Sequence, residues 1–142
     1  MSILRRFEEE LREYIIAQGW KVSFPTTWQY EFAGDHEVFF PKDNFEPTVR
    51  IQTIYATRPD GTLAAPGELR VNCPEGFSVR KDVEIPGFLL DVYEGTIVED
   101  GNTLHQLNVN VMAEGFLLIV SVFSVNKEAN EKTLDYLKTI RR

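Results

Sequence analysis

The side chains best suited to nucleophilic or metal chemistry are two histidines, His36 and His105, and a single cysteine, Cys73. Cys73 and His105 could act as nucleophile and base, but Cys73 precedes Pro74 without a recognisable catalytic motif. Asp35-His36-Glu37 offers three metal-ligand types. Neighbours on a strand point to opposite faces, however, and cannot converge on one ion. The sequence therefore predicts neither a metal site nor a catalytic cysteine.

The acidic residues and glycines give no catalytic signature either. Asp91 and Glu94 lie three apart in one expected strand, which places them on opposite faces and prevents them from acting as an acid–base pair. Asp60-Gly61 and Asp100-Gly101 are typical of turns, and no glycine-rich phosphate loop is present. We therefore expect no catalytic residue and no cofactor, and a non-enzymatic function is favoured over an enzymatic one.

Polar side chains that repeat at every second position are the first candidates for binding. Gln106, Asn108 and Asn110 share one face of an expected strand over 103–114, and Arg50 and Gln52 form a similar row in 48–57. If the two strands are adjacent, amide and guanidinium groups line one patch that suits a peptide or a small polar ligand. The alternative is the ordinary hydrated half of a partly covered sheet.

Aromatic residues are the second candidates. Tyr30, Phe32 and Phe45 fall in segments that resemble loops, where we expect them to be exposed. Exposed aromatic side chains are enriched at protein–protein interfaces. The three residues therefore predict a protein-binding patch.

Composition limits the classes of partner and the compartment. The 142 residues carry a net charge of −7, which argues against a nucleic-acid-binding surface. The single cysteine allows no internal disulfide, and Glu8, Glu9 and Glu10 interrupt the start of the chain where a signal peptide would be apolar. The uncharged apolar run 115–126 is about half the length that a membrane helix needs. We therefore expect a cytoplasmic protein without membrane insertion.

Periodicity predicts a single α+β domain over 1–142. Apolar residues at steps of three and four indicate an amphipathic helix over 2–18, ended by Gly19. From 20 to 125 the period is two, which indicates an antiparallel sheet. Asn126 caps a second helix over 127–140.

The strand over 116–125 is apolar on both faces, and such a strand must be covered on both faces. This predicts an α/β/α layered arrangement with that strand at the centre. The turn before it, Glu114-Gly115, is expected to need a positive φ at Gly115.

The run Gly19-Trp20-Lys21-Val22-Ser23-Phe24-Pro25-Thr26-Thr27-Trp28 resembles the opening strand and Phe-Pro-x-x-Trp turn of the PsbP-like superfamily. The hairpin over 89–112, the apolar strand and the last helix resemble the rest of that fold. The superfamily includes a photosystem lumenal subunit, a Ran-binding import factor and Eag-type chaperones of secretion effectors. The predicted helix over 2–18 departs from the Eag-type chaperones, which favours an uncharacterised bacterial branch.

The resemblance implies a non-catalytic protein-binding domain, with a secretion-associated chaperone or adaptor as its most specific form. Two alternatives stay open. One is a small-molecule-binding or enzymatic domain with its site on the polar sheet face. The other is a self-associating module, a homo-oligomer joined along an edge strand such as 37–40.

Overall fold

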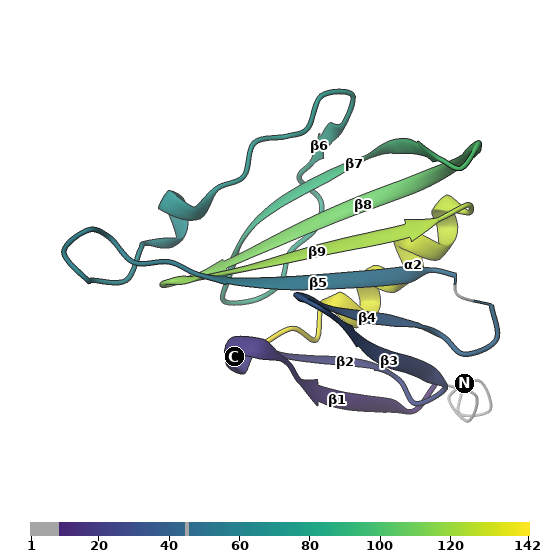
Figure 1. Ribbon diagram of the computed structural model, residues 1–142, viewed down its shortest axis with the longest axis horizontal. Helices are drawn as coiled ribbons and strands as arrows, with labels where there is room; N and C mark the ends of the chain where they lie inside the picture. The colour runs from purple at the N-terminus through teal and green to yellow at the C-terminus, as the bar shows by residue number, and fades with distance from the viewer. Residues whose placement is uncertain (1–8, 45) are drawn as a thin grey trace.

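Within the residues that the structure describes, the regular elements are mostly antiparallel strands, followed by one α-helix near the C-terminus (Figure 1). The computed structural model describes residues 9–44 and 46–142. Within them the elements are β1 (Leu11–Ile15), η1 (Ala17–Gly19), β2 (Lys21–Pro25), β3 (Trp28–Ala33), β4 (His36–Pro41), β5 (Thr48–Tyr55), η2 (Pro66–Leu69), β6 (Ser78–Arg80), β7 (Leu89–Glu99), β8 (Asn102–Ala113), β9 (Phe116–Ser124) and α2 (Lys127–Leu137).

The main sheet has the strand order β3-β4-β5-β9-β8-β7-β6 in the described residues, and every neighbouring pair is antiparallel. β1 and β2 form a separate hairpin. The predicted antiparallel sheet is therefore confirmed, and so is the long β7–β8 hairpin with its turn at Asp100-Gly101. β9 lies in the middle of the order, between β5 and β8, as its apolar sequence indicated.

The predicted N-terminal helix is wrong over the described part of its range, and residues 2–8 of that range lie outside the described residues. Leu11–Ile15 is a strand that pairs with β2, from Leu11 opposite Pro25 to Ile15 opposite Lys21. Gln18 and Gly19 both have positive φ values, 63° and 80°, which turn the chain back sharply. The helix on which the predicted departure from the Eag-type chaperones rested is therefore not found over residues 9–18, where a strand precedes β2 instead.

The predicted closing helix is confirmed but shorter than 127–140. The Asn126 side chain accepts a hydrogen bond of 2.9 Å from the backbone N–H of Glu128 and so caps α2. The helix ends at Leu137, and beyond it Arg141 pairs with Lys21 of β2. This pairing fixes the C-terminal segment against the β1–β2 hairpin.

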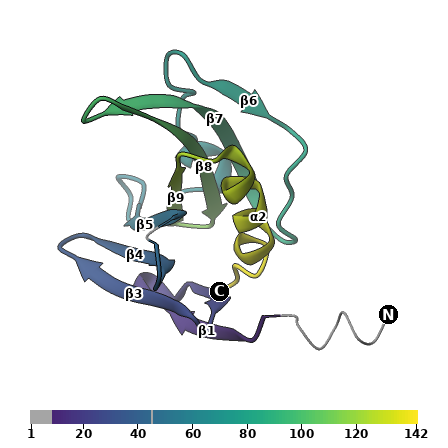
Figure 2. The ribbon, with the colours of Figure 1, turned by 90° about the vertical axis from the view of Figure 1, so that its right-hand side faces the viewer.

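The hydrophobic core lies between one face of the main sheet, α2 and the β1–β2 hairpin. We call this side of the sheet the core face; it carries Phe39, Ile51, Val109 and Val120, none of which is exposed. Figure 2 shows α2 on that side, while β7 and the β3–β4 hairpin curve away from the helix. We call the other side of the sheet the opposite face.

The predicted α/β/α layering is wrong, because α2 is the only α-helix in the described residues. The opposite face is covered in part by the segment 56–77 instead. The Ala64 carbonyl accepts a 2.7 Å hydrogen bond from Gly115 N–H, and the Phe77 ring lies against Gly95. A segment this rich in proline and glycine cannot form a second helical layer. The partial cover explains why β9 is apolar on both faces.

The segment 37–40, which the sequence predicted as an edge strand, does not lie at an edge of the main sheet. The segment 37–40 belongs to β4, which pairs with β3 on one side and with β5 on the other. It is therefore not an edge strand. The two edges of the main sheet are β3 and the short strand β6.

Candidate functional site

The polar rows predicted on β5 and β8 lie on one face but not on adjacent strands. β9 separates them: Arg50 is opposite Ser121, and Ser121 is opposite Asn108. Neighbouring strands are about 4.8 Å apart, so Arg50 and Asn108 are separated by roughly 10 Å of sheet. The register nevertheless brings both rows onto the opposite face.

Four of the five predicted polar residues reach the surface. Arg50 and Gln52 are exposed, and Gln106 and Asn108 are half-buried. Gln106 Nε2 donates a 2.8 Å hydrogen bond to Asn108 Oδ1. Asn110 is only 3% exposed, so it is not available as a surface contact. We call the following residues the Arg50 patch: Arg50, Gln52, Gln106, Asn108, Ile119, Ser121 and Phe123.

Arg50 is the charged centre of this patch. Its guanidinium carbon lies 5.3 Å from the centroid of the Phe123 ring, a cation–π contact. None of the ion pairs among the described residues includes Arg50. Its hydrogen-bond donors therefore remain free for a carboxylate from outside the chain.

The predicted aromatic patch is not part of the same surface. Tyr30 and Phe32 lie on β3 rather than in a loop, and Phe45 lies outside the described residues. Tyr30 pairs with Phe39 of the core face, so it points to the side away from Arg50. Tyr30 and Phe32 are 39% and 61% exposed, as predicted. The two sets of candidate residues therefore occupy opposite sides of the sheet.

Tyr30 is anchored by a buried carboxylate. Its hydroxyl donates a 3.2 Å hydrogen bond to Glu37 Oε1, and its ring lies 5.0 Å from that of Phe39. Glu37 is only 6% exposed. Burial raises the pKa of the Glu37 carboxyl above its ordinary value, although hydrogen bonds from Tyr30 and the Ala17 backbone act in the other direction.

We expect Glu37→Gln to raise the thermal midpoint at pH 7. A carboxyl whose pKa is raised in the folded state makes the protein less stable as pH rises past its unfolded pKa. Glutamine keeps an acceptor for the Tyr30 hydroxyl and carries no charge. The gain over wild type should shrink toward zero as pH falls to 4, because Glu37 then becomes protonated in the folded and in the unfolded protein alike. Paired thermal melts at pH 4, 5.5 and 7 measure this; a midpoint that is lower at pH 7 contradicts it.

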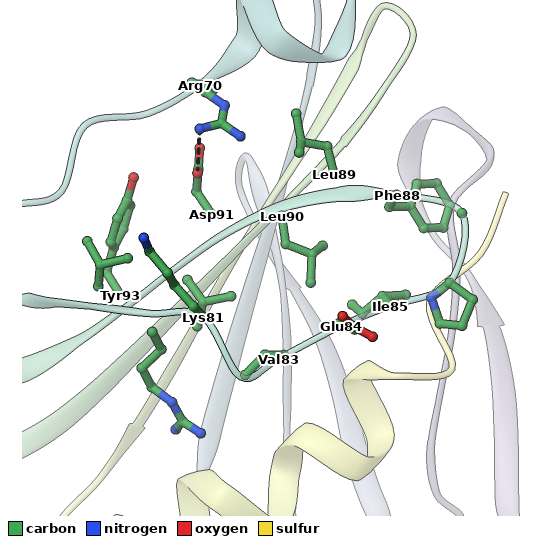
Figure 3. Close-up of a pocket in the computed structure, with 15 residues that line it drawn as sticks. Arg70, Lys81, Val83, Glu84, Ile85, Phe88, Leu89, Leu90, Asp91 and Tyr93 are labelled. Atoms are coloured by element: carbon green, nitrogen blue, oxygen red, sulfur yellow. Dashed lines mark ion pairs between the residues drawn. The ribbon is translucent and has the colours of Figure 1, made fainter.

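A second candidate site, which the sequence did not reveal, lies at the β6 edge of the sheet. It is a pocket of about 790 Å³ between β7 and the segment 81–88 (Figure 3). β6 ends at Arg80, and its last partner on β7 is Val92. The chain then leaves the sheet edge, and Val83 and Ile85 enter the hydrophobic core. The departure of the chain leaves the pocket open beside residues 89–91.

An ion pair lies on one side of β7 at this pocket, and apolar side chains lie on the other. In Figure 3, Arg70 and Asp91 lie on one side of the strand, and Leu90, Val83 and Ile85 lie on the other. Arg70 Nη1 is 3.6 Å from Asp91 Oδ1. The Tyr93 hydroxyl donates a hydrogen bond to the Val71 carbonyl, which ties the segment carrying Arg70 to β7.

Arg80, at the other end of the pocket, is fully engaged. It pairs with Asp82 at 2.7 Å, with Glu94 at 3.4 Å and with Glu131 of α2. The guanidinium holds the pKa of Asp82 at about 2. As the sequence predicted, Glu94 and Asp91 have different partners on different faces of β7. Arg80 therefore fixes the loop rather than a ligand.

The residues first considered for catalysis have local contacts. His36 Nδ1 lies 2.8 Å from Asp35 Oδ1, and the Cys73 thiol donates to the Phe77 carbonyl at 3.4 Å. Across residues 9–44 and 46–142, no three His, Cys, Asp or Glu side chains are grouped so that they could hold a metal ion. In the same ranges, no helix has the length and apolar character to cross a membrane.

The topology and core are those of an α+β fold, and comparison with solved structures shows that this fold is PsbP-like. A protein from Bacteroides thetaiotaomicron superposes with a TM-score of 0.65 at 14% identity, covering 92% of this chain and 47% of that one. This chain thus spans about half the length of the Bacteroides protein. Cyanobacterial PsbP (CyanoP) from Synechocystis superposes with a TM-score of 0.63 at 12% identity, covering 94% of this chain and 93% of that one. No family model and no curated protein sequence matches the chain.

Proposed function

We propose that this chain is a non-catalytic protein-binding domain that holds its partner on the Arg50 patch. The observation that carries the proposal is an exposed arginine without an ion-pair partner among the described residues, beside a half-buried apolar strand. A chaperone or adaptor for a secreted protein is the most specific form of this proposal, and the PsbP-like fold is its support.

The side chains of the patch indicate which groups a partner must present to bind there. Arg50 offers a planar set of donors that suits a carboxylate. Ile119 and Phe123 supply apolar surface between the polar rows, and Gln52 and Asn108 supply amides that both donate and accept. The partner segment should therefore present an acidic side chain next to an apolar one.

Site-specific photo-cross-linking in cells of the source organism tests this proposal. A photoreactive amino acid replaces Gln52 in the patch or, as a control, the exposed Lys138 at the end of α2, behind the core face. We expect a discrete protein adduct from position 52 and none from position 138. Adding Arg50→Glu should reduce the adduct about tenfold or more, because a charge-assisted hydrogen bond contributes roughly 1.5–3 kcal/mol.

Lys42→Glu is the matched charge control, because Lys42 is exposed and lies in the turn after β4. It changes the net charge by the same amount and should leave the adduct intact. Equal adducts from positions 52 and 138, or an adduct that survives Arg50→Glu, would exclude the Arg50 patch as the binding surface.

A further inference from the structure

We propose that the pocket between β7 and the segment 81–88 is a second binding site, and that it takes a carboxylate carried on an apolar group. This goes beyond the function proposed for the Arg50 patch, because different residues at the sheet edge form the pocket. Its volume of about 790 Å³ is within the range of roughly 300–1,000 Å³ that is common for small-molecule sites.

Two cationic side chains at the pocket, Arg70 and Lys81, have hydrogen-bond donors that no other described residue uses. Arg70 is about half exposed, and its one ion pair is the 3.6 Å contact with Asp91, which is too long for a hydrogen bond. Lys81 is exposed and lines the pocket, and no ion pair or hydrogen bond to another described residue involves its side chain. In an acidic protein, two such cations beside one pocket favour an anionic ligand.

Asp91 positions Arg70 rather than competing with the ligand. One carboxylate oxygen, Oδ1, faces Arg70, whereas Oδ2 is buried without a hydrogen-bond partner among the described residues. Only 13% of the Asp91 side chain is exposed, and the adjacent Arg70 guanidinium offsets its charge. Arg70 is thereby kept beside β7 with most of its N–H groups free, and two of them can grip a carboxylate side by side.

Most of the other side chains that line the pocket are apolar. Leu89 is 38% exposed, Leu90 and Phe88 are half-buried, and Val83 closes the side next to the core. The other carboxylate at the pocket, Glu84, lies on the side of β7 away from Arg70 (Figure 3). A ligand with its carboxylate on Arg70 and Lys81 would therefore place its apolar part on Leu89, which lies on the same side of β7 as Asp91 (Figure 3), where burial is favourable.

Two sources supply this chemistry: a free aliphatic carboxylic acid and the C-terminal carboxylate of a polypeptide that ends in an apolar residue. Isothermal titration calorimetry with octanoate tests the first source, and octanol is its uncharged match. The peptide acetyl-Ala-Ala-Leu with a free C-terminus tests the second, and the same peptide with an amidated C-terminus is its match. We expect one carboxylate to bind with 1:1 stoichiometry and its uncharged match to bind at least about tenfold more weakly.

The variants Arg70→Gln and Lys81→Gln should each weaken binding of that carboxylate about tenfold, because each removes a charged hydrogen bond. Lys42→Gln is the matched control and should bind as wild type does. Arg50→Glu should also bind as wild type does, which separates this site from the Arg50 patch. Amide NMR shifts on titration should be largest near Arg70 and Leu89. The proposal is wrong if neither carboxylate binds, or if Arg70→Gln and Lys81→Gln bind as tightly as Lys42→Gln.

Discussion

Val120→Asp is expected to abolish the folded state. Val120 is completely buried on β9, opposite Ile51 on one neighbouring strand and Val109 on the other. An aspartate there loses valine packing and buries a charge with no partner, which costs several kcal/mol. Single domains are stable by only about 5–15 kcal/mol, and the largest single-site losses come from such changes. Circular dichroism should show no cooperative thermal transition.

Ser121→Asp is the matched control, one residue further along the same strand. Ser121 is half-buried on the opposite face, directly across from Arg50, so a carboxylate there gains an adjacent cation. We expect its free energy of unfolding to stay within about 1 kcal/mol of wild type. If Val120→Asp melts cooperatively near the wild-type midpoint, β9 does not lie at the centre of the sheet.

The strands that the sequence predicted well are those with a clear local signal. Asp100-Gly101 between two alternating segments predicts the β7–β8 hairpin, because the turn needs positive φ at both residues, and both have it. The Asn126 cap predicts the start of α2 in the same way. Local chemistry determines these elements, so one sequence is enough to predict them.

The N-terminal error has a different origin. Leu11, Tyr14 and Ile15 fit a helical period, but Leu11 and Ile15 are 47% and 72% exposed, whereas Ile16 is buried. The strand exists because β2 pairs with it, and this partner follows only after the Gln18-Gly19 turn. Tertiary pairing overrides local periodicity here, as it often does for short strands.

In the candidate sites, too, the sequence predicted the features that local geometry determines and missed those that depend on tertiary contacts. Alternation along β5 and β8 predicted correctly which side chains share a face, since strand geometry fixes this. It could not show that β9 lies between the rows or that Asn110 is buried. The pocket at β7 depends on the place where β6 ends and on the approach of Arg70 to Asp91, 21 positions apart in the chain. Such long-range contacts leave no periodic pattern in a single sequence.

Gly115→Ala should lower the free energy of unfolding by about 2 kcal/mol or more. Gly115 has a φ of 77°, as the turn before β9 predicted, and alanine at such a φ costs about 1 kcal/mol. An added Cβ would also lie 2.7 Å from Leu63 Cδ2 and 3.1 Å from Leu63 Cβ, so the side chain that covers this turn must move. The backbone cannot shift to relieve the contact, because Gly115 bonds to Ala64 and Ala56 at 2.7 and 2.8 Å.

Gly101→Ala separates the two contributions to this loss, the cost of a positive φ and the contact of the added Cβ with Leu63. Gly101 has nearly the same φ, 78°, but nothing lies within 4 Å of an added Cβ, so it should lose only the conformational part, about 1 kcal/mol. Urea unfolding of both variants, and of Gly115→Ala combined with Leu63→Ala, measures the difference. We expect the double variant to lose less than the sum of its single losses, because removing Leu63 opens space for the new methyl group. Equal losses for Gly115→Ala and Gly101→Ala would mean that Leu63 does not pack on the turn, and that the segment 56–77 does not cover the opposite face there.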